Sequence, residues 1–222
     1  MNAREAILSA VRGALSGAKP TELAPAYNRV GELSAEARRD RFLSRLHDYN
    51  VYVVRVTDAS GIAAATAARL AAAGSTRYLC PADLPPEWRP QGIEAREDPE
   101  ADPLPYAEIE AAPSVVSGCA LAIAETGTVA LDAGPRQGRR VLSLLPDHHI
   151  CIVFERQLVE MVPEALAALK PAIQAGRPVT FFSGPSATAD IEFDRVVGVH
   201  GPRRLDVVFV EELTAAFASD AS

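Results

Sequence analysis

Apolar residues recur along this chain of 222 residues at two different spacings, and the spacing changes near residue 50. Before that point they recur every three or four positions, which is typical of amphipathic helices. One helix is predicted over residues 2–16 and a second over residues 34–48, where Ser34 is the N-cap. A linker with two prolines lies between them. The apolar face of the first helix comprises Ile7, Leu8, Val11 and Leu15.

Beyond residue 50, short apolar runs that are typical of buried strands alternate with helical patterns. Helices are predicted from the N-cap residue Asp58 to Gly74 and over residues 156–170. Residues 81–106 contain seven prolines and many acidic residues, which predicts a long surface loop. The predicted strands cover residues 51–56, 77–80, 115–116, 128–131, 150–154, 179–182 and 205–210. Continuous apolar strands between amphipathic helices indicate an α/β fold whose mostly parallel sheet is covered on both faces.

The composition is typical of a globular protein, with 48% hydrophobic and 23% charged residues. A net charge of −7 argues against nucleic-acid binding through a general basic surface. No apolar run approaches the ~20 residues that span a bilayer. The first residues, Met1–Glu5, lack an apolar signal core, so a cytoplasmic location is predicted.

The three cysteines, Cys80, Cys119 and Cys151, are widely spaced and mostly lie in apolar runs. They form no C-x-x-C pair, so neither a zinc ribbon nor an iron–sulfur ligand set is predicted. Buried, reduced thiols are expected instead. The adjacent His148 and His149 would point to opposite sides of a strand and could not easily bind one ion. The sequence therefore predicts no resident metal or cofactor.

Polar, glycine and proline residues concentrate between the last two predicted strands. Gly184 lets the backbone approach a ligand, and Ser186 or Thr188 can cap a helix whose free N–H groups attract an anion. A helix that opens within residues 183–188 is therefore predicted, with a well-capped connection and an exposed acidic edge as the alternative. The candidate general acid–base is His200. The candidate anion-binding residues of this block are Ser183, Gly184, Ser186, Thr188, Asp190, Glu192 and Gly201.

Two further clusters carry candidate chemistry. Glu125-Thr126-Gly127-Thr128 forms a predicted turn between strands, with hydroxyls at Thr126 and Thr128, a flexible Gly127, and a carboxylate that could act as base or nucleophile. The alternative is a hairpin turn with a solvated Glu125. Residues 136–140 place three arginines within five positions, which suits a carboxylate or phosphate but is also common in solvated loops.

These motifs resemble the lactate-utilisation protein C family, whose domain is called the LUD domain. The resemblance rests on Ser183–Glu192 followed by Gly198–Pro202, on Ala122–Leu131, and on Leu144–Ile150, in matched order over roughly residues 115–210. It implies the three-layer fold shared with coenzyme A transferases, sugar-phosphate isomerases and folate cyclo-ligases. The helical pattern before residue 50 predicts an N-terminal helical arm over residues 1–48, and a LUD-type α/β domain is expected over residues 49–222.

The resemblance implies a function as well. The expected role is that of a subunit without redox centres, which works beside iron–sulfur partners in an L-lactate-oxidising complex. A cleft would bind a small organic acid or a phosphate-bearing ligand. The alternative is a freestanding enzyme of acyl or coenzyme A transfer with Glu125 as nucleophile, so whether the chain is catalytic by itself stays open.

Overall fold

The structure is a computed structural model that describes residues 2–17, 27–189, 195–197 and 201–212. Its centre is a six-stranded sheet in which every pair of neighbours is parallel. In their order across the sheet, the strands are β1 (Tyr52–Val56), β12 (Arg204–Val210), β7 (His148–Phe154), β4 (Ser114–Ser117), β2 (Arg77–Pro81) and β3 (Glu94–Asp98). The prediction of an α/β fold with a mostly parallel sheet is confirmed.

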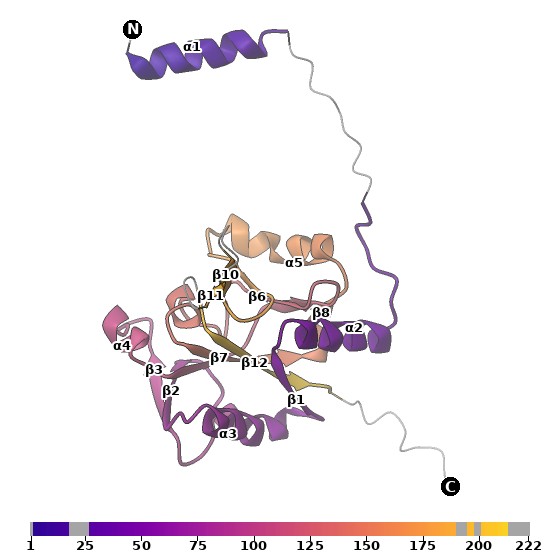
Figure 1. The fold of residues 1–222 in the computed structure, drawn as a ribbon, viewed down its shortest axis with the longest axis vertical. Coiled ribbons are helices and arrows are strands. Elements are labelled where there is room, and N and C mark those ends of the chain that lie inside the picture. Colours follow the sequence, from indigo (N-terminus) through magenta and orange to yellow (C-terminus); the bar gives the residue numbers. More distant parts are fainter. Residues whose placement is uncertain (1, 18–26, 190–194, 198–200, 213–222) are drawn as a thin grey trace.

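A smaller, four-stranded sheet packs on one face of the six-stranded sheet. Its strands are ordered β8 (Leu158–Val159), β5 (Leu121–Ile123), β6 (Thr128–Leu131) and β9 (Thr180–Phe182). Helix α5 (Val162–Gln174) covers the outer face of this sheet, and helix α3 (Ile62–Ala72) covers the opposite face of the six-stranded sheet. Figure 1 shows these layers from α3 at the bottom to α5 at the top.

The alternation of side chains along β7 and β12 builds two cores from the same strands. Cys151 and Val153 face the smaller sheet, together with Val207 and Phe209 of β12. The intervening residues of β7 and β12 face α3. Because both faces are covered, these strands are apolar over most of their length, which explains why the sequence predicted them.

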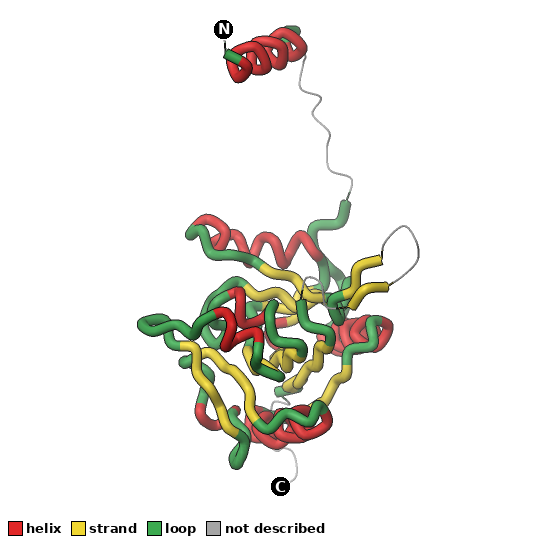
Figure 2. Tube along the Cα trace, turned by 60° about the vertical axis from the view of Figure 1, so that its left-hand side comes forward, coloured by secondary structure: helices red, strands yellow, loops and turns green. Residues whose placement is uncertain are grey.

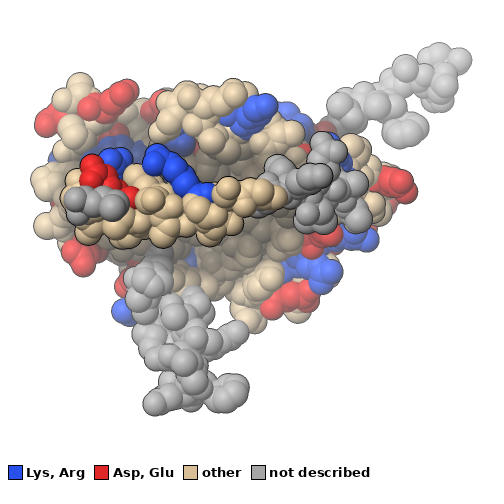
Figure 3. Space-filling view, turned by 90° about the horizontal axis from the view of Figure 1, so that it is seen from above, with Lys and Arg blue, Asp and Glu red and all other residues tan. Residues whose placement is uncertain are grey.

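The two N-terminal helices differ in how they pack. Helix α1 (Ala3–Leu15) buries none of its residues, and Figure 1 shows it apart from the rest of the chain. Helix α2 (Ala35–Asp48) begins after the predicted cap Ser34 and buries Phe42 and Leu46 in the core between the two sheets. Among the described residues, no helix is long and apolar enough to cross a membrane. On the face seen in Figure 3, acidic and basic side chains are interspersed.

Three sequence predictions of local structure are wrong. Strand β3 lies inside the predicted loop over residues 81–106, which also holds a short turn of 3-10 helix at Pro86–Trp88. As a largely exposed edge strand of sequence EARED, β3 lacks the apolar pattern that marks the buried strands. The short helix α4 (Tyr106–Glu110) follows the loop.

The predicted helix over residues 156–170 begins later than expected. Residues Glu155–Gln157 form a 3-10 turn, and Leu158 belongs to β8, which pairs with β5. Helix α5 starts at Val162 with Pro163 in its first turn, where proline lacks only an N–H that would have no helical partner.

The helix predicted to open within residues 183–188 does not form. The chain bends at residues 183–185 and then enters strand β10 (Ala187–Ala189), which pairs antiparallel with β11 (Arg195–Val197). The Ser186 N–H donates to the Pro202 carbonyl at 2.8 Å, so this backbone donor is already used. Figure 2 shows the β10–β11 pair projecting from the body of the domain.

Candidate functional site

The turn at Glu125–Thr128 joins β5 to β6, as the sequence predicted. The hydroxyl oxygens of Thr126 and Thr128 lie 2.7 Å apart, and Thr128 Oγ1 lies 2.7 Å from Ser183 Oγ. This row of three hydroxyls connects the turn to the segment that follows β9. Two of the predicted clusters are therefore in direct contact.

Helix α2 covers the other side of this turn. Gly127 has φ +61°, and a Cβ added there would lie 2.5 Å from Arg45 Cβ and 3.0 Å from the Arg45 carbonyl carbon. Arg45 Nε donates to the Glu125 carbonyl at 3.2 Å. The half-buried Glu125 carboxylate has no hydrogen bond or ion pair within the described part of the chain. The glycine is therefore required both for its backbone conformation and for the close approach of α2.

An open cavity of about 430 Å³ lies beside β9, and its wall includes residues that precede the N-terminal ends of β7 and β12. None of its described lining residues belongs to the Glu125–Thr128 turn, but Thr128 of the turn contacts the lining residue Ser183. The lining residues are Arg140, Leu144, Val179, Thr180, Phe181, Phe182, Ser183, Gly184, Ser186, Gly201 and Pro202. The structure thus brings part of the predicted anion-binding block together with one residue of the arginine cluster.

The three arginines of that cluster have different surroundings. The Arg136 guanidinium lies 5.7 Å from the centre of the Trp88 ring. Arg139 donates two hydrogen bonds to the buried Asp98 carboxylate, at 2.7 and 2.6 Å, which raises the pKa of Arg139. The Arg140 guanidinium has no hydrogen bond, ion pair or ring contact among the described residues, although the Arg140 carbonyl accepts a hydrogen bond from Ser143 Oγ at 2.9 Å.

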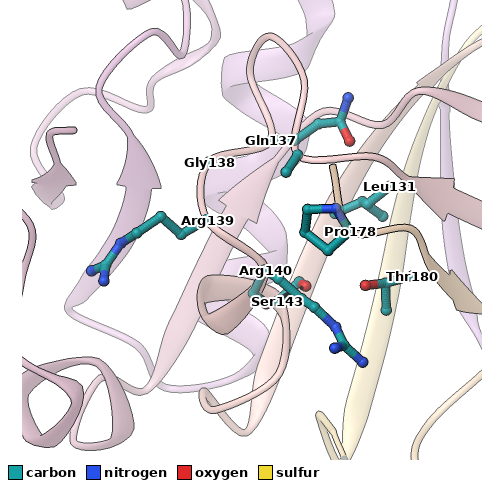
Figure 4. A pocket seen from close by; sticks show the side chains of 9 residues that line it. Leu131, Gln137, Gly138, Arg139, Arg140, Ser143, Pro178 and Thr180 are labelled. Atoms are coloured by element: carbon teal, nitrogen blue, oxygen red, sulfur yellow. Dashed lines mark hydrogen bonds between the residues drawn. The ribbon is translucent and has the colours of Figure 1, made fainter. Parts of the chain in front are cut away.

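Figure 4 shows that Arg139 and Arg140 diverge although they are adjacent in sequence. The Arg139 side chain points away from Thr180, whereas the Arg140 side chain extends past Pro178 toward Thr180. A small crevice between these elements also has Arg140 and Thr180 in its wall. One arginine thus serves an internal ion pair, while the next faces open space.

A second cavity, of about 550 Å³, lies where ligands commonly bind in α/β sheets. From β2 the chain continues to the edge strand β3 and then returns to β4 on the other side of β2. The order in which successive strands join the sheet therefore reverses next to β2, and ligands of α/β proteins commonly bind at such a point. Both arginines in this cavity wall are already paired, Arg139 with Asp98 and Arg177 with Asp132. The wall also contains Asp83 and Glu100, so it carries more acidic than basic groups.

His148 and His149 point to opposite faces of β7, as predicted from their adjacency. His148 lies 2.9 Å from Ser114 Oγ and 3.0 Å from Asp206 Oδ2, whereas His149 Nε2 lies 2.8 Å from Ser117 Oγ. Burial lowers the pKa of His149 to about 3. In the described ranges, no group of three or more His, Cys, Asp or Glu side chains is placed to hold a metal ion. All three cysteines are buried and free, in agreement with the prediction.

Asp206 was missed by sequence reasoning because it lies in the apolar run that forms β12. Its buried carboxylate accepts hydrogen bonds from Arg69 Nε at 2.8 Å and from Arg204 Nη2 at 2.9 Å, besides its contact with His148. Burial by itself would raise the pKa of Asp206, but the hydrogen bonds from these partners lower it to about 2. A single acidic residue within a buried strand was the available signal.

Several predicted site residues fall outside what the structure describes. Asp190, Glu192 and His200 lie outside the described residues, and Thr188 is described only by its backbone. Their proposed roles in binding and in acid–base chemistry stay predictions.

Comparison with known proteins identifies the relationship of the chain. Residues 97–210 match the LUD domain family. Lactate utilization protein C of Deinococcus radiodurans is 42% identical over 205 residues, covering 92% of this chain and 93% of that protein. Lactate utilization protein C of Bacillus velezensis is 36% identical over 131 residues, or 57% of this chain and 54% of that protein.

A solved structure is also similar to this chain. The crystal structure of a DUF162 family protein from Deinococcus radiodurans superposes with a TM-score of 0.68 at 38% identity, covering 81% of this chain and 99% of the other. The match to the family and the identity to its members both extend over more than half of the sequence. The chain belongs to the LUD domain family.

Proposed function

We propose that this protein acts in lactate utilization as a cytoplasmic subunit without redox centres, beside iron–sulfur partners in a lactate-oxidising complex. The observation that carries the proposal is the 42% identity to a lactate utilization protein C along nearly the whole of both chains. Oxidation of lactate requires a group that accepts electrons or hydride. Three buried, widely spaced cysteines offer no thiolate set for an iron–sulfur cluster, so partner subunits would supply that group.

The proposed contribution of this subunit is a binding site for a small organic acid such as lactate or pyruvate. The cavity beside β9 supports this role, since hydroxyls at Thr180 and Ser183 and the turn at Gly184 lie in its wall. Its apolar side, which includes Leu144 and Phe182, suits the carbon skeleton of such an acid.

Co-purification tests the complex. The tagged chain should retain cluster-bearing proteins encoded by neighbouring genes, and the assembled complex should oxidise L-lactate with an artificial electron acceptor. Omission of this subunit should abolish that activity. Lactate oxidation at a comparable rate by the isolated chain, or by the partners without it, would contradict the proposal.

Glu125→Gln separates the subunit role from the acyl-transfer alternative. A carboxylate nucleophile would lose nearly all turnover when converted to an amide. The Glu125 carbonyl receives the hydrogen bond from Arg45, and the substitution leaves that backbone group in place. A binding subunit should therefore keep most of its support for lactate oxidation, whereas acyl transfer by the isolated chain that is abolished in Glu125→Gln would favour the acyl-transfer enzyme.

A further inference from the structure

The Arg140 guanidinium differs from its neighbours in having its full hydrogen-bonding capacity available. Arg139 on one side is bound to Asp98, and the more distant Arg177 is bound to Asp132. Arg140 is exposed and begins a short 3-10 turn at Arg140–Ser143, and its guanidinium has no partner among the described residues. Its five N–H donors can therefore meet a ligand without breaking an internal contact.

The charge around Arg140 favours an anion. Among the described residues, the wall of the cavity beside β9 contains no acidic side chain, whereas Asp83, Asp98 and Glu100 all line the larger cavity near β2. A guanidinium matches the two oxygens of a carboxylate in a bidentate arrangement. Counted over the described lining residues of the two cavities, only the wall that contains Arg140 carries a net positive charge.

The backbone near the cavity argues for a carboxylate over a phosphate. Phosphoryl groups are commonly bound by the N–H groups at a helix N-terminus, in addition to cationic side chains. The chain after Ser183 forms strand β10 instead of a helix, and the Ser186 N–H is bonded to Pro202. A single guanidinium with nearby hydroxyls provides one positive charge, which balances a monocarboxylate.

The geometry points to Arg140 as the residue that binds the carboxylate of a small monocarboxylic acid in the cavity beside β9. Thr180 and Ser183 would meet the polar substituents of the acid, and the apolar wall at Leu144 and Phe182 would contact its carbon atoms. This inference rests on the proposed function and deepens it by naming the anchoring residue and the class of ligand.

Titration followed by amide NMR tests this assignment in the full-length chain. L-Lactate, pyruvate, propionate and inorganic phosphate are added separately to the wild type, to Arg140→Gln and to Arg140→Lys. Arg96→Gln is the matched control, because it removes one positive charge from an exposed ion pair on β3, outside the cavity wall. Dispersed amide spectra of each variant establish that it is folded.

In the wild type and in Arg96→Gln, the monocarboxylates should shift the amides of residues 140–144 and 180–184, and phosphate should bind more weakly. Arg140→Gln should weaken monocarboxylate binding by roughly ten- to a hundredfold, the range expected for hydrogen bonds to a charged group. Arg140→Lys, which keeps the charge without the planar fork, should fall between the two.

Equal monocarboxylate affinity in the wild type and Arg140→Gln would overturn the role of Arg140 while leaving the organic-acid site intact. Phosphate binding at least as tight as lactate binding would overturn the ligand class. No shift at this cavity in the wild type with any monocarboxylate would overturn both the inference and the proposed binding site.

Discussion

The two cavities on either side of the loop after β6 differ in whether their arginines form ion pairs with the described residues. In the cavity near β2, each guanidinium is held by a buried aspartate, and further acidic groups line the wall. In the cavity beside β9, Arg140 faces open space with hydroxyl and apolar neighbours. A cation that is already paired contributes to the fold, whereas an unpaired cation remains available to a ligand. The proposed anion site is therefore distinguished by an unpaired arginine, and neither by the size of the cavity nor by a position at the carboxyl ends of strands.

Replacing each of the adjacent arginines by glutamine should show the largest difference between a paired and an unpaired guanidinium. Arg139→Gln leaves the buried Asp98 carboxylate without its bidentate partner and should lower the free energy of unfolding by about 3 kcal/mol. Arg140→Gln removes no internal contact and should change it by less than about 0.5 kcal/mol. Urea unfolding followed by circular dichroism measures both, and equal losses would contradict the distinction.

Gly127→Ala tests whether the turn beside Ser183 depends on close packing by α2. An alanine there adopts an unfavourable positive φ and also meets Arg45, so a loss of about 2–4 kcal/mol in unfolding free energy is expected. Gly74→Ala is the matched control, because Gly74 has φ +68° but no atom within 4 Å of an added Cβ. The control should lose only about 1–2 kcal/mol. Equal losses of unfolding free energy in the two variants would show that close packing against α2 adds nothing to the cost of Gly127→Ala.

His149 should make the fold sensitive to mild acid. Its pKa is about 3 in the folded chain, because it is buried, and near 6.5 when unfolded. Between these values the unfolded state binds more protons, so stability is complete above pH 6.5 and falls as the pH decreases toward 3. From pH 6.5 to 5 this residue should cost up to about 2 kcal/mol.

His149→Phe removes the titrating group while keeping a ring of similar size against Phe182. Urea unfolding at several pH values should show a shallower dependence between pH 6.5 and 5 in this variant than in the wild type. The window lies above the titration of Asp206, whose pKa is lowered to about 2, so that carboxylate stays charged throughout. The same slope in both proteins would exclude His149 as the cause.

The row of hydroxyls between the turn and β9 should have the smallest effect. Thr128→Val and Ser183→Ala each remove one partner of the 2.7 Å contact and should each cost about 0.5–1.5 kcal/mol in unfolding free energy. In a double-mutant cycle the two losses should not add, because the second substitution removes no further contact between these residues. Strictly additive losses would show that the two hydroxyls do not interact.

The sequence predicted those parts of the fold whose pattern is dominated by burial. Strands β7 and β12 contain continuous apolar runs that are buried on both faces, and α2 shows its N-cap and its apolar side. Strand β3 was missed because an exposed edge strand has no apolar requirement. The helix predicted after Ser183 was wrong because capping residues also suit tight bends, and pairing between β10 and β11 decided the outcome.

The candidate site was predictable only in its components. The motif residues Ser183, Gly184, Ser186 and Gly201 meet at one cavity, and Thr128 contacts Ser183. The sequence could not distinguish Arg139 from Arg140, because their difference depends on where Asp98 lies in the folded chain. The contacts of Asp206 with Arg69 and His148 were also not predictable, because these partners are distant in sequence and come from other elements.

A crystal structure of the protein grown with L-lactate tests the central distinction between the two cavities most directly. We expect lactate beside β9, with its carboxylate oxygens within about 3.2 Å of the Arg140 guanidinium and with the pairs Arg139–Asp98 and Arg177–Asp132 unchanged. Lactate bound instead to Arg139 or Arg177 in the cavity near β2, with Arg140 unoccupied, would contradict it.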